Sequence, residues 1–206
     1  MKNTKLFALL LCAALTISML ATGCSEGKTP PTSSDEPAQS ENGGSLSTGT
    51  AAELGSMKSF TAATLDGGSF TQEDIAAKDV TVINFWSLMC GPCVAEMPDI
   101  AAFSKALPDN VRMVTVCLDG TGDEESAKSI LSEAGYEGVT LLSGDGDFKG
   151  LCDNIQYTPT TIVIDAEGNL VGDAIIGGQE DLSGTFLTAV NAALKASGKA
   201  EISLEK

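Results

Sequence analysis

The chain has 206 residues, which is enough for one domain with a substantial core and flanking segments. It contains no histidine, and this excludes Ser-His-Asp and Cys-His nucleophile systems as well as imidazole-ligated metal and haem sites. The formal net charge of −16 disfavours contact with a phosphate backbone. No nucleic-acid partner is therefore expected, and the acidity is interpreted as a solubility feature.

Residues 1–23 have the pattern of an export signal. Lys2 and Lys5 precede a mostly apolar run, Leu6 to Leu20, which fits a signal h-region and is shorter than the roughly 20 residues that span a bilayer. The run ends Leu20-Ala21-Thr22-Gly23-Cys24, which resembles a bacterial lipobox with its leucine one place early. We expect Cys24 to be lipidated, giving an extracytoplasmic protein anchored to the cell membrane; ordinary cleavage leaving a free thiol is the alternative.

The next segment has the composition of a tether. Of the 32 residues from Ser25 to Ser56, 19 are Ser, Thr, Gly or Pro. Such a segment cannot bury enough apolar surface to offset the entropy lost on ordering. The predicted organisation is a lipoprotein signal peptide over 1–23, a disordered tether over 24–56 and a folded domain over 57–206.

Strand and helix patterns alternate through the folded part. Strands are predicted at 60–65, 69–70, 80–86, 111–118, 139–142, 160–165 and 170–176. Helices are predicted at 72–77, 91–107, 123–134, 147–155 and 179–196. This order predicts an α/β domain with a mixed central sheet, helices on both faces and an N-terminal β-hairpin closed by a glycine-rich turn.

The buried strand 80–86 leads into the motif Cys90-Gly91-Pro92-Cys93. A cysteine at a helix N-terminus faces unpaired N–H groups and the positive end of the helix dipole, so its thiolate is stabilised. The spacing lets Cys93 form a disulfide with Cys90, and Pro92 fits the first helical turn because its missing N–H has no partner there. The motif predicts dithiol–disulfide chemistry at the carboxyl end of a central strand, where such sheets place their sites.

Several motifs together resemble a known family. They are Phe85-Trp86, the Cys90–Cys93 motif followed by Glu96 and Pro98, and Tyr157-Thr158-Pro159-Thr160-Thr161. These resemble the thioredoxin-like fold over roughly residues 60–196. With the lipobox, they are similar to the TlpA/ResA-like family of membrane-tethered thiol-disulfide oxidoreductases.

The resemblance implies a role for each residue of the cysteine motif. Cys90, the more exposed, would attack a client disulfide, and Cys93 would resolve the mixed disulfide. Gly91 and Pro92 would tune the reduction potential, as in reducing thioredoxins.

The resemblance also implies a substrate-binding region. Pro159 would follow a cis peptide bond, and the backbone of Thr158 would pair with a client segment like an added strand. Met89, where a tryptophan is usual in the family, and Trp86 are assigned to the same region, Trp86 mainly as core packing beside it. Met89 has an alternative reading as a flexible gap-filler.

One departure from the family concerns the proton that leaves Cys93. Cytosolic thioredoxins have a buried aspartate in the strand, whereas this chain has Asn84, which cannot take that proton. Glu96 is the candidate proton acceptor. A plain helix-dipole role for Glu96 is the alternative.

Two further cysteines, Cys117 and Cys152, lie outside the motif. In an extracytoplasmic protein an even pair suggests a second disulfide, and two separate buried thiols are the alternative. A zinc site that combines them with Cys90 and Cys93 is disfavoured because the spacing lacks a second close pair. The acids Asp119, Asp123, Glu124 and Glu125 are interpreted as a solvated helix start rather than as a cation site.

The expected function is reduction of protein disulfides without a cofactor or metal. The family resemblance implies a CcdA- or DsbD-like membrane protein as electron donor, and clients such as apocytochrome c, a methionine sulfoxide reductase or misoxidised surface proteins. Two rivals stay open. A thiol peroxidase would need a Pro-x-x-x-Thr-x-x-Cys setting that is missing at Cys90, and a copper-delivery module of this fold usually has a histidine.

Overall fold

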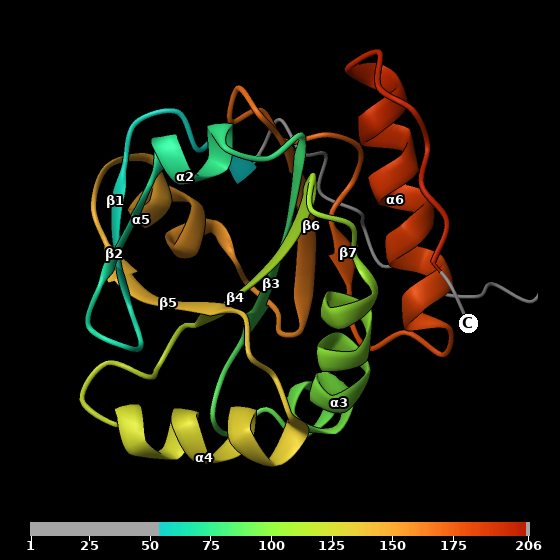
Figure 1. Ribbon diagram of the computed structural model, residues 1–206. Coiled ribbons are helices and arrows are strands. Elements are labelled where there is room, and N and C mark those ends of the chain that lie inside the picture. The colour runs from blue at the N-terminus through green and yellow to red at the C-terminus, as the bar shows by residue number, and fades with distance from the viewer. Residues whose placement is uncertain (1–53, 205–206) are drawn as a thin grey trace, which may run out of the picture. The chain divides into compact units, whose positions relative to one another are not determined.

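The computed structural model describes residues 54–204. Seven strands form one mixed sheet in the order β2-β1-β5-β4-β3-β6-β7 (Figure 1). The strands are β1 (Thr61–Thr64), β2 (Ser69–Thr71), β3 (Val80–Trp86), β4 (Val111–Cys117), β5 (Val139–Gly144), β6 (Thr160–Asp165) and β7 (Ile175–Ile176). The helices are α2 (Gln72–Ala76), α3 (Gly91–Ala106), α4 (Glu124–Ala134), α5 (Gly146–Asn154) and α6 (Leu182–Ala196).

Strand β3 lies at the centre of the domain. It pairs in parallel with β4 and antiparallel with β6, and all seven of its residues are buried. Because side chains alternate along a strand, Val82 and Trp86 point into one core cluster while Ile83 and Phe85 point into the other. The first cluster packs under α3, α4 and α6, and the second packs under α2 and α5.

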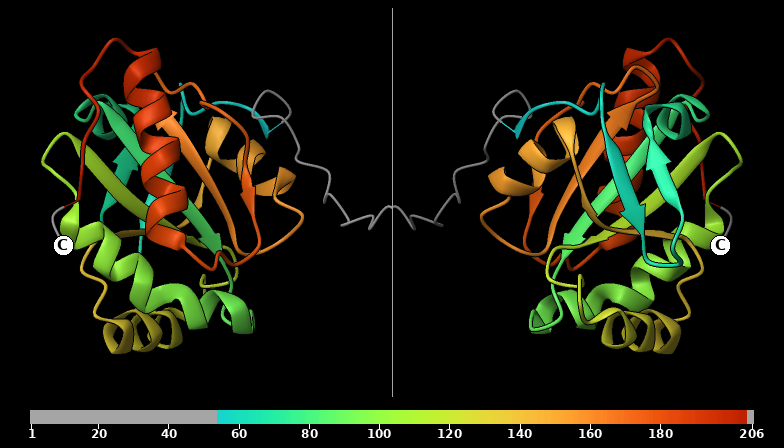
Figure 2. Two further views of the ribbon diagram at one scale, coloured as in Figure 1. Left: turned by 90° about the vertical axis from the view of Figure 1, so that its right-hand side faces the viewer. Right: turned by 90° about the vertical axis from the view of Figure 1, so that its left-hand side faces the viewer.

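The two clusters lie on opposite faces of the sheet. Figure 2 shows α6 in front of the sheet from one side and behind it from the other. The helices α3 and α6 meet through Phe103 and Phe186, whose rings are edge to face with centroids 5.5 Å apart. This contact joins α6 to the helix that begins at the cysteine motif.

Residues just ahead of Met57 contact the folded domain. Leu54 packs against the second core cluster, and Ser56 forms an isolated β-bridge with Asn169. The Asp147 carboxylate accepts hydrogen bonds from the Ser56 hydroxyl at 2.9 Å and from the Lys58 N–H at 2.9 Å. Leu54 and Ser56, which the composition assigns to the tether, are thus held against the domain by core packing, a β-bridge and the Asp147 carboxylate.

The predicted strand 170–176 is also corrected. Only Ile175–Ile176 forms β7, and Leu170 contributes an isolated bridge to Ile164. Between them Gly172 adopts a φ of +76°, which turns the chain out of the extended conformation. The result is a short edge strand that pairs with the start of β6, next to Pro159.

The predicted signal peptide, the lipobox with Cys24 and the tether up to residue 53 lie outside the described residues. Within residues 54–204, no helix combines the length and apolar character that crossing a membrane requires.

Candidate active site

Cys90 is the N-cap residue of α3, directly after the loop that follows β3. Its sulfur is bonded to that of Cys93 and accepts a hydrogen bond from the Cys93 N–H at 3.3 Å. Cys93 is completely buried, whereas Cys90 is half-buried. One sulfur of the pair is thus open to an incoming thiol or disulfide, and the other is shielded beneath it, as the resemblance implies.

A proline loop lies beside the disulfide. The Thr158–Pro159 peptide bond is cis, and the Thr158 carbonyl oxygen is 3.5 Å from Cys90 Sγ. The Pro159 carbonyl accepts the Gly177 N–H at 2.8 Å, and the Thr160 hydroxyl donates to the Tyr157 carbonyl at 2.8 Å. The backbone of this loop is therefore held at the outer sulfur by bonds on both sides of the proline.

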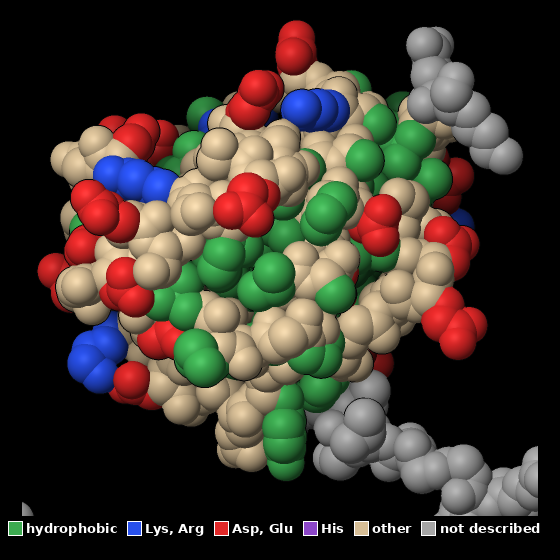
Figure 3. All heavy atoms as spheres, turned by 90° about the horizontal axis from the view of Figure 1, so that it is seen from below, with side chains coloured by type: hydrophobic (Ala, Val, Ile, Leu, Met, Phe, Trp, Pro, Cys, Tyr) green, Lys and Arg blue, Asp and Glu red, His purple; other side chains and the backbone are tan. Residues whose placement is uncertain are grey.

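The face around the disulfide is apolar at its centre. Seen from below, towards the end of the sheet where β3 and β4 stop, hydrophobic side chains gather in the middle and carboxylates surround them (Figure 3). Three large hydrophobic residues are exposed in the described part of the chain: Met89 at 91%, Tyr157 at 61% and Val94 at 36%. All three belong to segments that flank Cys90 or Pro159, so we name Met89, Val94 and Tyr157 the apolar rim.

Trp86 has no place on this face. It is completely buried in the first core cluster, and its indole N–H has no hydrogen-bond partner among the described residues. The prediction that Trp86 takes part in substrate binding is wrong for this structure, because the strand places it beneath the site with its neighbours in β3. Its packing role is the one that the structure shows.

Glu96 lies one helical turn after Cys93 and is only 9% exposed. Its Oε1 accepts a hydrogen bond from Asn84 Nδ2 at 3.2 Å. Burial raises the pKa of Glu96 to about 7, the Asn84 hydrogen bond opposes this rise, and the nearby Asp99 charge adds to it. Residues i and i+3 of a helix are neighbours, so a buried carboxyl that titrates near neutrality lies next to the shielded cysteine.

This burial predicts a pH-dependent stability. The folded protein holds the Glu96 proton up to about pH 7, whereas the unfolded chain releases it near 4.5. The stability contributed by this group is complete below pH 4.5 and is lost as the pH rises through 7, by on the order of 3 kcal/mol. We expect Glu96→Gln to remove that loss.

Urea unfolding of the oxidised protein at pH 5 and pH 8.5 measures this effect. From pH 5 to pH 8.5, the free energy of unfolding should fall less in Glu96→Gln than in the wild-type protein. Parallel pH dependences for the two proteins would contradict a buried, protonated Glu96.

Asp119 fixes the loop in front of Cys90. Its Oδ1 accepts the Leu88 N–H at 2.9 Å and the Cys117 thiol at 3.6 Å. Cys117 is completely buried at the end of β4, opposite Trp86 in the strand register, and burial raises the pKa of its thiol to about 12. Cys117 is thus an un-ionised structural donor near neutral pH, and Asp119 joins β4 to the active-site loop.

The predicted disulfide between Cys117 and Cys152 is not formed. Both thiols are free; Cys117 belongs to the first core cluster and Cys152 packs against the second, on the other face of the sheet. Burial also raises the pKa of Cys152 to about 12. The structure therefore contains two separate thiols, which is the alternative that the sequence left open. Within residues 54–204 no three Cys, Asp or Glu side chains come together to hold a metal ion.

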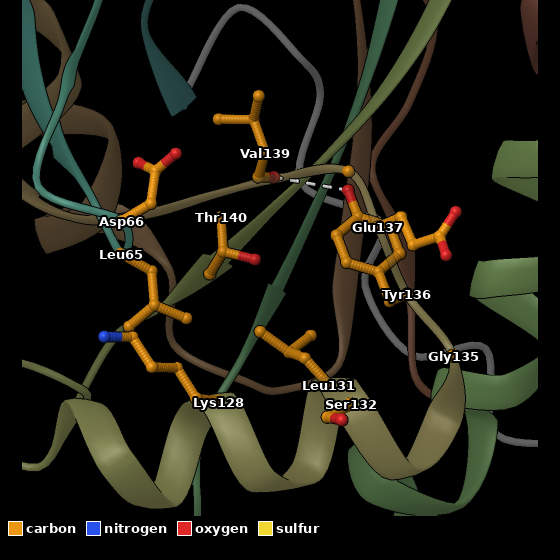
Figure 4. Close-up of a pocket in the computed structure, with 11 residues that line it drawn as sticks. Leu65, Asp66, Lys128, Leu131, Ser132, Gly135, Tyr136, Glu137, Val139 and Thr140 are labelled. Carbon is orange, nitrogen blue, oxygen red and sulfur yellow. Dashed lines mark hydrogen bonds between the residues drawn. The ribbon is translucent and has the colours of Figure 1, made fainter.

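A pocket of about 450 Å³ lies elsewhere, between α4, the turn after β1 and the start of β5 (Figure 4). Leu65, Lys128 and Leu131 are among its lining residues. The buried Tyr136 hydroxyl donates to the Val139 carbonyl at 3.2 Å in its wall. None of the residues predicted for the site lines this pocket.

The family follows from a direct comparison. The model of the Redoxin family matches residues 52–184. This chain is a redoxin. The match includes the cysteine motif, Glu96 and the proline loop, so the geometry described above belongs to the part of the chain that defines the family.

Curated relatives of this redoxin have thiol–disulfide names. The thiol:disulfide interchange protein HelX of Rhodobacter capsulatus is 28% identical over 102 residues, which are 50% of this chain and 55% of HelX. The DsbE homolog of Paracoccus denitrificans, also named a thiol:disulfide interchange protein, is 30% identical over 139 residues, 65% of this chain and 73% of the homolog. The match thus spans little more than half the length of HelX.

A solved structure supports the same fold. The thioredoxin domain of a thiol-disulfide oxidoreductase from Bacteroides vulgatus is 26% identical, with a TM-score of 0.53. It covers 71% of this redoxin, which in turn covers 100% of that domain. The thioredoxin-like fold and the likeness to the TlpA/ResA-like oxidoreductases, both predicted from the sequence, are confirmed.

The sequence did not reveal all the residues that shape the site. Asp119 is one of four clustered acids, and nothing in the pattern distinguishes the carboxylate that binds Leu88 N–H. In the sequence, Thr161 stands out only as part of the motif around Pro159, and Asn84 only as the residue that replaces the aspartate of cytosolic thioredoxins. The alternation of β3 places Asn84 on the same face as Val82, and this signal does predict that its side chain turns towards α3.

Proposed function

We propose that this redoxin is an extracytoplasmic thiol-disulfide oxidoreductase that reduces disulfides of client proteins through Cys90 and Cys93. The observation that carries the proposal is the pair of bonded cysteines at the start of α3, with Cys90 Sγ beside the Thr158 carbonyl of the proline loop. The names of the relatives, which describe thiol:disulfide interchange, agree with it.

The reaction begins with the Cys90 thiolate. It attacks one sulfur of the client disulfide; the client S–S bond breaks, a mixed disulfide forms, and the second client sulfur leaves as a thiolate. The Cys93 thiolate then attacks Cys90 Sγ, which closes the Cys90–Cys93 bond and releases the first client sulfur. Two electrons pass from the dithiol to the client, and two protons from solvent complete the client thiols.

Glu96 is proposed as the group that takes the proton from Cys93 before the second attack. Its burial, its position one turn after Cys93 and its pKa of about 7 support this assignment. A base with a pKa near the working pH can both accept and release a proton.

The direction of electron flow is tested by the reduction potential of the Cys90–Cys93 pair. Gly91 and Pro92 between the cysteines support a potential near that of thioredoxin, about −270 mV, and a value near that of DsbA, about −120 mV, would make the protein an oxidant. Equilibration with glutathione followed by alkylation measures the potential. Two assays identify the reaction. Faster reduction of insulin by dithiothreitol in the presence of the protein indicates a disulfide reductase, and consumption of peroxide indicates the rival thiol peroxidase.

The apolar rim and the Thr158–Pro159 loop are proposed to bind the client next to its cystine. We expect Met89→Ser to raise KM for a protein disulfide about five- to tenfold, because burying this side chain in a complex contributes on the order of 1 kcal/mol. Stopped-flow reduction of a disulfide-bonded peptide gives kcat and KM separately. Met89→Leu is the control and should leave KM near wild type; an unchanged KM in Met89→Ser would remove Met89 from the binding surface.

Lipidation of Cys24 is proposed as the membrane anchor, and a CcdA- or DsbD-like membrane protein as the source of electrons. The lipobox-like sequence before Cys24 supports the first proposal, and the family resemblance supports the second. Mass spectrometry of the N-terminal peptide from bacterial membranes, compared with Cys24→Ser, tests the anchor. Loss of the reduced form of the protein when such a donor is deleted tests the electron source.

A further inference from the structure

A buried polar group in the middle of β3 has an incomplete set of hydrogen bonds. Asn84 is completely buried, and its amide nitrogen donates both to Glu96 Oε1 at 3.2 Å and to Thr161 Oγ1 at 3.0 Å. Its Oδ1, by contrast, has no hydrogen-bond partner among the described residues. A buried acceptor without a donor is unfavourable, and an apolar side chain at this position would avoid it.

The surroundings of Glu96 show what this amide can do. The charged or titratable groups near the carboxyl are Asp99 and Cys93, both on α3. From other elements, Asn84 on β3 hydrogen-bonds the carboxyl, and Gly178 lies near it, with an added Cβ 3.7 Å from Glu96 Oε2. Neither residue carries a charge, and Thr161 on β6, which bonds Asn84, is also uncharged. Asn84 is the residue whose side chain hydrogen-bonds the carboxyl.

We propose that Asn84 is a positioning residue that serves both protonation states of Glu96 during turnover. An amide carries donors and an acceptor on one group. The structure shows the amide N–H donating to Oε1. This arrangement suits an ionised Glu96, whose oxygens only accept hydrogen bonds. With Glu96 protonated, a half-turn of the amide about its Cβ–Cγ bond brings Oδ1 to accept the new O–H.

Thr161 can follow this turn because a hydroxyl both donates and accepts. In the ionised state it accepts from the amide nitrogen, and after the turn it donates to Oδ1. The proton itself moves without any change of oxidation state: the S–H bond of Cys93 breaks as the O–H bond of Glu96 forms. This inference rests on the proposed roles of Cys93 and Glu96.

The test follows the titration of the Glu96 carboxyl by ¹³C NMR in the oxidised protein, where the bonded Cys90 and Cys93 do not titrate. Asn84→Leu keeps the branched shape of the side chain and removes both the donor and the acceptor. The N–H bond to the ionised form disappears, so we expect the titration midpoint of Glu96 to rise by about one pH unit, a tenfold shift. Thr161→Val keeps the Asn84–Glu96 bond and should shift the midpoint by less.

A second arm examines turnover. Asn84→Leu should shift the pH profile of client reduction relative to the wild-type protein. The double variant Asn84→Leu/Glu96→Gln should have the same pH profile as Glu96→Gln alone. If Asn84→Leu does not fold, Asn84→Ser, whose hydroxyl is too short to reach Glu96, replaces it with the same expectation. A Glu96 midpoint equal to wild type in the folded variant overturns the proposal. The oxidised-state titration needs no client, so it gives its answer even if disulfide reductase activity is absent.

Discussion

Cys90→Ser is expected to lose protein disulfide reduction by about a thousandfold or more, the scale on which removal of an attacking nucleophile acts. The structure places Cys90 Sγ as the accessible sulfur of the pair, so its partner cannot substitute for it: Cys93 is completely buried. Dithiothreitol-driven insulin reduction, followed by turbidity, measures the loss. A wild-type rate in Cys90→Ser would remove Cys90 from the chemistry.

Two companion variants sharpen this result. Cys93→Ser keeps the attacking thiol but cannot resolve the intermediate, so it should accumulate a mixed disulfide with the client that mass spectrometry detects. Cys152→Ser is the matched control, because Cys152 packs against the cluster on the opposite face of the sheet from Cys93. It should retain wild-type activity.

Phe186→Ala is expected to lower the free energy of unfolding by about 3–5 kcal/mol. The Phe186 ring is 1% exposed and meets Phe103 edge to face, so its removal leaves a cavity between α6 and α3. Urea unfolding of the oxidised protein measures the change. Since Phe103 belongs to α3, the loosened contact should also change the reduction potential of the pair at the start of that helix.

Leu187→Ala is the control for this substitution. Leu187 is the next residue of α6 and is only partly buried, so the loss of stability should be clearly smaller. Equal losses in the free energy of unfolding for the two variants would contradict a specific stabilising role for the Phe103–Phe186 contact. They would indicate instead that any truncation on α6 weakens the fold to the same extent.

Most of the fold could be predicted because its signals are local. The β-branched run 80–86 and the strand 160–165 have the predicted bounds, and the helices differ by a few residues at their ends. The errors arise where distant groups decide the structure. Asp147 orders Ser56 across 91 positions of sequence, and no local pattern contains that contact.

The candidate site divides in the same way. The placement of Cys90 at the start of a helix follows from the local motif, and the cis bond before Pro159 follows from the resemblance. The separation of Cys117 from Cys152 depends on which face of the sheet each side chain takes. The high pKa of Glu96 depends on its burial beside Asn84 of β3 and Gly178 of the loop after β7. These contacts between distant segments have no local signal in the sequence.

The point at which the chain enters the domain has a practical consequence. Ser56 pairs with Asn169, in the turn after β6, and the last residue of β6 is opposite Val80, the first residue of β3. Cys90 follows the other end of β3, about 20 Å away along a seven-residue strand. A resin, dye or fusion partner joined ahead of Leu54 is therefore attached at the opposite end of the sheet from Cys90. Because the attachment point is distant from the disulfide, immobilised protein should exchange disulfides as fast as free protein.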